Sequence, residues 1–138
     1  MLYDKELYHY VFLHFPIALF ITGYMFDLLS FMKPGRHYKK FSNWNIILGI
    51  FWGIITIITG FITDNDIGHM ENFLPIWTTH GTHMIVSVFS FIIFLYLKKL
   101  VKSEKMILSS KHLLFIHTLL IIFFIHGAQI GAKLADRL

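Results

Sequence analysis

The sequence contains four long apolar runs, at about residues 8–32, 43–63, 79–97 and 112–132, and most of its charges lie between them. About 20 residues of apolar α-helix are enough to cross the ~30 Å hydrocarbon core of a bilayer. Of the 138 residues, 56% are hydrophobic and 14% are charged, whereas soluble domains average about 25% charged. A domain this small cannot hide so much apolar surface from water, so we expect lipid to cover it.

The stretches that join the four runs are short, which makes consecutive helices antiparallel neighbours. The sequence therefore predicts an all-α fold, an integral membrane up-down four-helix bundle, as a single four-span domain over residues 1–138. Pro34 and Gly35 interrupt the helix after the first run. Gly49 and Gly53 in the second run have the small-xxx-small spacing, which favours close helix packing over a ligand site.

The basic residues predict the orientation of these spans. Nine of the twelve Lys and Arg residues lie in the first and third loops, which share one side of a four-span protein. Basic loops favour the cytoplasmic side of a membrane. We therefore expect a multi-pass protein of the inner (cytoplasmic) membrane with both termini extracytoplasmic. Three spans with a re-entrant third run are the alternative.

Composition excludes several kinds of site and partner. The chain has no cysteine, so it cannot supply a disulfide, a thiolate metal site or the ligands of an iron–sulfur cluster. Its net charge of +4 comes from loop residues that form no continuous basic face, so nucleic acid is not an expected partner. The partner that we expect instead is the lipid bilayer around the four spans.

Histidines recur at one depth near the expected outer ends of three runs. His14, His83 and His126 each lie about six residues inside the outer end of a run. His80 lies nearer the rim and three residues before His83, so the two share a helix face; His9 is also expected at the rim. Ionisable groups inside membrane spans are costly and are typically functional. One such histidine can bond headgroups, water or a carbonyl, but the three together favour a bound cofactor or metal.

His14 and His83 are the predicted axial ligands of a haem b. The first and third helices of an up-down bundle are diagonal, roughly 12–14 Å apart if neighbours are 8–10 Å apart. That separation suits two imidazoles on one iron, and histidine-ligated haem is well suited to electron transfer. The other expected site residues are small or polar and lie at or above this level: Gly60, Gly127, His80, His126 and Lys133. A zinc or copper ion held by His80, His83 and His126 is the competing interpretation.

Asp27 and His117 form a second polar pair, toward the cytoplasmic ends of the first and fourth runs. These two runs become neighbours when the bundle closes. A hydrogen bond between the two side chains would offset the cost of burying both. We expect a structural tie, with a proton-relay or quinone-side role as the functional alternative.

The stretch His14-Phe-Pro-Ile-Ala-Leu19, with His9 before it and Asp27 after it, resembles the signature of an uncharacterised family of small four-span bacterial membrane proteins. The resemblance covers nearly the whole chain and continues through later motifs: Thr59-Gly60 with Asp64, His80-Gly-Thr-His83, and Gly127 with Gly131. The family often has His-Pro where this chain has His9-Tyr10, and a longer polar tail. Its relatives occur fused or adjacent to Rieske-type or cytochrome c-type modules, so the resemblance implies a redox setting.

The sequence therefore predicts a haem b-binding membrane protein that transfers electrons to or from a partner near the outer face. A redox protein or a respiratory complex is the expected partner, and a homo-oligomer is a further option. The alternatives are a non-redox accessory or packing subunit of a larger membrane complex and a histidine-based zinc or copper site. An electron-transfer or accessory role is expected rather than that of a stand-alone enzyme.

Overall fold

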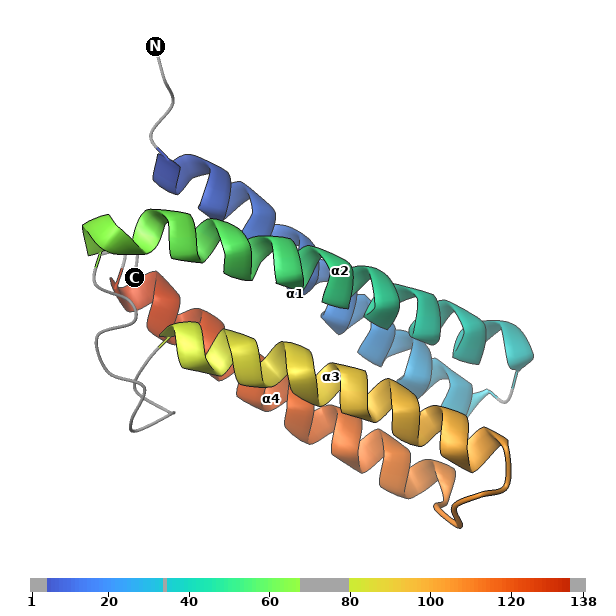
Figure 1. Cartoon of the computed structure of the whole chain (residues 1–138). Helices are drawn as coiled ribbons and strands as arrows, with labels where there is room; N and C mark the ends of the chain where they lie inside the picture. The colour runs from blue at the N-terminus through green and yellow to red at the C-terminus, as the bar shows by residue number, and fades with distance from the viewer. Residues whose placement is uncertain (1–4, 34, 68–79, 135–138) are drawn as a thin grey trace.

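The structure is a computed structural model that describes residues 5–33, 35–67 and 80–134. Four helices account for nearly all of them: α1 (Lys5–Met32), α2 (Arg36–Ile67), α3 (His80–Lys102) and α4 (Ser110–Leu134). Each helix contains a stretch long and apolar enough to cross a membrane. The predicted all-α fold with four candidate spans is confirmed (Figure 1).

The four helices form an up-down bundle in which each helix packs beside two others. Helix α1 packs beside α2 and α4, and α3 packs beside the same two helices, so α1 and α3 lie on a diagonal. Helix α1 begins and α4 ends at the same end of the bundle (Figure 1). This arrangement brings residues of the first and fourth spans together, as the sequence predicts.

All four helices are longer than the apolar runs that predicted them, and two of them gain turns that carry lysines. Helix α2 begins at Arg36 rather than at about residue 43, and α3 continues to Lys102 rather than ending at about residue 97. The added turns carry lysines, whose aliphatic stems can lie along an apolar surface while the ammonium group reaches out of it. Lysine therefore does not mark the end of a helix here.

Aromatic side chains fill the middle of the bundle. Phe20 of α1 and Phe91 of α3 stack across the diagonal with ring centres 3.8 Å apart, and Phe124 of α4 meets Phe20 edge-on at 5.1 Å. All three rings are completely buried. A Cβ added at Gly49 would lie 2.7 Å from the Phe20 ring. Gly49 therefore lets α2 approach this ring closely, which agrees with its predicted packing role.

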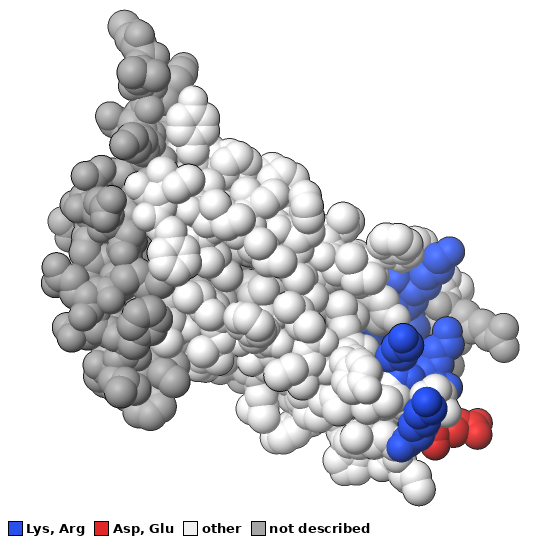
Figure 2. Space-filling model, in the orientation of Figure 1, with Lys and Arg blue, Asp and Glu red and all other residues white. Residues whose placement is uncertain are grey.

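The outer surface of the bundle is apolar along most of its length. Large hydrophobic side chains are more than half exposed on every helix, among them Met32, Phe51, Phe89 and Phe115. Soluble monomers rarely expose continuous apolar surface on this scale. In the face shown in Figure 2, Lys and Arg gather at one end of a largely uncharged body. This distribution fits a body surrounded by lipid.

The two ends of the bundle differ in chemistry, and we name them by their residues. The lysine end is where α1 is followed by α2 and α3 by α4, and it carries Lys39, Lys40, Lys98 and Lys102. The histidine end is where α1 begins and α4 ends, and it carries His9, His80, His83 and His126.

Candidate functional site

Two buried imidazoles face each other across the diagonal at the histidine end. His9 of α1 is 6% exposed and His80 of α3 is 4% exposed. Their ring centres lie 6.4 Å apart and their planes are nearly perpendicular, at 80°. The structure thus joins the first and third helices through imidazoles, but through His9 and His80 rather than through His14 and His83.

Hydrogen bonds assign the tautomer of both rings. His80 Nδ1 lies 2.9 Å from the carbonyl oxygen of Gly127, which only accepts, so Nδ1 is the donor. His9 Nδ1 lies 3.3 Å from Thr59 Oγ1, and that hydroxyl donates its own proton to the carbonyl of Thr56 at 3.0 Å. His9 Nδ1 is therefore a donor as well. In the neutral form of each ring, Nε2 is then the nitrogen that carries the lone pair.

Three glycines of neighbouring helices provide the space that these histidines occupy. An added Cβ would meet the histidine side chain in each case: at Gly60 it would meet His9, at Gly127 it would meet His83, and at Gly131 it would meet His80. The sequence predicted that Gly60 and Gly127 leave room for a macrocycle. In the structure, histidine side chains lie against both of these glycines.

The other predicted ligands lie in different surroundings. His14 is exposed on α1, and its Nδ1 donates to the carbonyl of Tyr10 in the same helix at 2.6 Å. His83 is completely buried between α3 and α4, where it stacks on Phe123 with ring centres 4.9 Å apart. A second aromatic neighbour is His126, an exposed residue whose ring centre is 5.5 Å away. The structure therefore brings His83 and His126 together and directs His14 to the outside of the bundle.

The zinc or copper hypothesis requires three ligands around one ion. Within residues 5–33, 35–67 and 80–134, no three His, Asp or Glu side chains lie close enough together to hold a metal ion. His83 and His126 are neighbours, while His80 is directed toward Gly127.

At the opposite end, Asp27 is the centre of a buried polar network. His117 Nδ1 donates to Asp27 Oδ2 at 2.8 Å, so the hydrogen bond predicted from the sequence is present. Lys98 Nζ donates to both carboxylate oxygens at 2.9 Å and to Ser42 Oγ at 3.0 Å. Lys98 follows the predicted third run, and its role in this network was not predicted from the sequence. The signal for it was its position at the end of an apolar run, at the depth of Asp27.

Burial makes this network important for stability. His117 is completely buried, and the side chains of Asp27 and Lys98 are only 13% and 12% exposed. The rings of Tyr24 and Phe94 flank His117, with centres 5.3 and 4.8 Å away. Charges removed from water in this way are tolerated only when they are paired. Asp27 therefore holds α1, α3 and α4 together at the lysine end.

Comparison with known proteins gives one match. A family model described as "Predicted membrane protein (DUF2231)" matches residues 8–138, a range that includes both polar sites. No curated protein and no solved structure matches the chain.

Proposed function

The chain belongs to the DUF2231 family of predicted membrane proteins. We propose that it binds haem b and transfers electrons within the bilayer. The observation that carries the proposal is the His9–His80 pair at the histidine end. The two rings are buried, come from diagonal helices and have centres 6.4 Å apart. A haem between them would supply reversible one-electron chemistry.

The distance between the rings suits two ligands of one iron. A metal–imidazole bond of about 2 Å, with the ring centre about 1 Å beyond the nitrogen, separates two trans ring centres by about 6 Å. Both Nδ1 atoms donate to protein oxygens. Metal-binding histidines typically donate their second N–H in this way, which fixes the ring. We therefore propose that His9 and His80 would hold the haem iron, in preference to His14 and His83.

Surrounding residues support the same position. His83 lies one turn after His80 on α3, and His126 lies next to Gly127 on α4. The rings of both histidines would border the macrocycle. Lys133, exposed in the last turn of α4, is a cation for the propionates. If the lysine end faces the cytoplasm, as the basic residues favour, the haem lies near the outer face. A Rieske-type or cytochrome c-type protein, as the family resemblance implies, is then the proposed electron partner.

Reduced-minus-oxidised absorption spectra of protein purified from haem-replete cells test this proposal. Wild-type protein should show a Soret band and a narrow α band, with about one haem per chain. His9→Ala and His80→Ala should each lose the low-spin spectrum. His14→Ala is the matched control, because it removes an exposed histidine of α1, and it should keep the spectrum. Loss of the spectrum in His14→Ala, with retention in His9→Ala, would instead support the His14–His83 pair.

A non-redox packing subunit is the second candidate function. The observation that favours it is the close fit of three histidine side chains against Gly60, Gly127 and Gly131, which packs the histidine end. Colourless wild-type protein from haem-replete cells would support this candidate and would exclude haem binding. Colourless protein that contains one zinc or copper ion per chain would support a metal site.

A further inference from the structure

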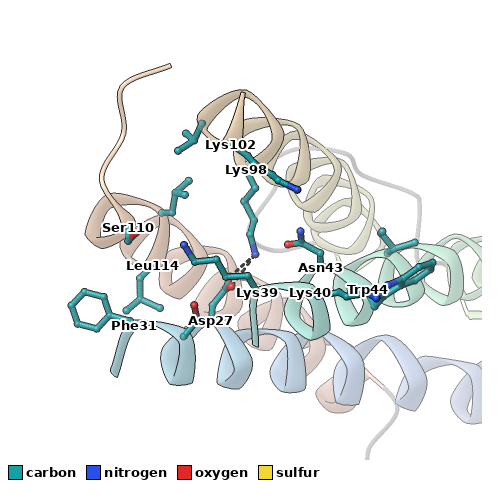
Figure 3. Close-up of a pocket in the computed structure, with 14 residues that line it drawn as sticks. Asp27, Phe31, Lys39, Lys40, Asn43, Trp44, Lys98, Lys102, Ser110 and Leu114 are labelled. Carbon is teal, nitrogen blue, oxygen red and sulfur yellow. Dashed lines mark hydrogen bonds and ion pairs between the residues drawn. The ribbon is translucent and has the colours of Figure 1, made fainter. Parts of the chain in front are cut away.

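A cavity of about 880 Å³ opens at the lysine end, and residues of all four helices line it. Figure 3 shows Lys98 reaching from α3 to Asp27 on α1 at this site, with Lys39, Lys40 and Lys102 around the same space. The cavity lies beyond the aromatic core of the bundle, at the opposite end from His9 and His80. Its chemistry is therefore independent of the proposed haem site.

The cavity is strongly basic. Four lysines line it, and Asp27 is the one acidic side chain among the described residues of its wall. The Asp27 carboxylate already accepts hydrogen bonds from Lys98 and His117. Lys39, Lys40 and Lys102 are exposed, so three positive charges in excess face the cavity. This charge favours an anion.

Two polar groups of the wall provide further hydrogen-bonding capacity. Ser30 is 7% exposed, and among the described residues its Oγ has no hydrogen-bond partner. The Oδ1 atom of Asn43 is buried and in the same part of the chain also has none. Both residues line the cavity. The hydroxyl of Ser30 can donate to an oxygen of an anion, whereas the Oδ1 atom of Asn43 can only accept a hydrogen bond.

Apolar side chains form the rest of the wall and indicate what the anion is attached to. Phe31, Trp44, Ile47 and Leu114 line the cavity together with the lysines. Phe31 and Trp44 are 44% and 52% exposed, on the lipid-facing surface of α1 and α2. A small inorganic ion would leave this apolar wall without a partner, whereas an acyl chain would cover it.

From these observations we propose that the cavity at the lysine end binds an anionic glycerophospholipid. The phosphate would lie among Lys39, Lys40 and Lys102, with Ser30 as a donor, and the acyl chains would lie against Phe31 and Trp44. Basic pockets between transmembrane helices are a general means of holding such headgroups. A lipid bound here would contact all four helices, at the end of the bundle where the Asp27 network joins them.

Native mass spectrometry of the full-length protein, titrated in detergent with phosphatidylglycerol or phosphatidylcholine, tests the proposal. The test variant is Lys39→Gln/Lys40→Gln. The matched control is Lys105→Gln/Lys111→Gln, which removes the same charge from exposed residues outside the cavity wall. At about 1 kcal/mol per lysine, the test variant should bind phosphatidylglycerol at least about tenfold more weakly. The control should stay within about twofold of wild type, and phosphatidylcholine should bind weakly to all three proteins.

Three outcomes would overturn the proposal. An equal loss in both double variants would mean that the anion responds to overall charge rather than to the cavity. No preference for phosphatidylglycerol over phosphatidylcholine would exclude an anionic lipid. Displacement of the lipid by an equal concentration of inorganic phosphate would identify free phosphate as the ligand. Ser30→Ala keeps the charge and should weaken phosphatidylglycerol binding a few-fold, which separates loss of the site from loss of the fold.

Discussion

Lys98 of α3 donates to both carboxylate oxygens of Asp27 of α1, at 2.9 Å each, across the diagonal of the bundle. The same two helices also meet at two other levels. From the histidine end to the lysine end, the diagonal pairs are His9 with His80, Phe20 with Phe91, and Asp27 with Lys98. The apolar Phe20–Phe91 layer thus separates two polar sites. Each site links the side chains of α1 and α3, the two helices on the diagonal of the bundle.

The Asp27–Lys98 ion pair should be strongly coupled in stability. Asp27→Asn leaves the buried Lys98 ammonium without its anion, and Lys98→Met leaves the carboxylate without its main cation. Each substitution should lower the free energy of unfolding by about 3–5 kcal/mol. The double variant should lose much less than the sum, because no unpaired charge is left behind. Equilibrium unfolding in detergent measures this, with the exposed neighbour Lys99→Met as control, and additive losses would contradict the ion pair.

The hydrogen bond between His117 and Asp27 should add its own coupling. His117→Ala removes a donor from a carboxylate that is 13% exposed, which should cost about 1–3 kcal/mol. In a double-mutant cycle, His117→Ala and Asp27→Asn should show a coupling energy above about 0.5 kcal/mol. His112→Ala, an exposed histidine of the same helix, serves as the control and should show none. A cycle without coupling would reject the hydrogen bond.

Gly127→Ala should destabilise the bundle, although alanine is the better helix former. Outside a packing contact, the exchange of Gly for Ala in a helix gains up to about 1 kcal/mol. At Gly127 the new Cβ would lie 2.7 Å from His83 Cβ, an atom fixed to the backbone. Overpacking of this kind costs about 1–3 kcal/mol. At Gly60 the nearest atom is the end of the His9 ring, at 3.1 Å, so Gly60→Ala should cost less. Thermal unfolding of both variants measures which of them loses more stability.

Both ends of the chain should lie outside the cytoplasm. Alkaline phosphatase fused after Leu138 should be active, because the enzyme folds only after export. The same enzyme inserted after Lys105, between α3 and α4, should be inactive. The reverse pattern would place the histidine end in the cytoplasm and would remove the argument for an extracytoplasmic electron partner.

The depth of a residue could be predicted from the sequence, but its direction around the helix axis could not. Run lengths predicted the four helices, and matched depth on neighbouring spans predicted the Asp27–His117 hydrogen bond. Depth also placed His14 level with His83. His9 and His14, however, are five residues apart, which is about 1.4 helical turns, so both cannot face the core. The buried positions of α1 include His9, Pro16, Gly23 and Ser30, and His14 does not share their face.

For a related reason, the contact of Lys98 with Asp27 could not be predicted from the count of loop charges. A lysine at the end of a span can belong to a cytoplasmic loop, or it can belong to the helix and direct its side chain into the bundle. The choice depends on whether an acid on another helix lies within reach, and only the packing of α1 against its neighbours brings Asp27 to that place. The sequence showed that Gly60 and Gly127 are small residues at the level of the histidines. Which side chain lies against each glycine also depends on how the helices pack.

We propose that His9 and His80 hold one haem iron between them. Electron paramagnetic resonance of the oxidised wild-type protein tests this proposal. Because the two ring planes are 80° apart, the spectrum should be a strongly anisotropic low-spin ferric signal that accounts for about one iron per chain. A purely high-spin signal, or no haem iron in protein purified from haem-replete cells, would contradict the claim.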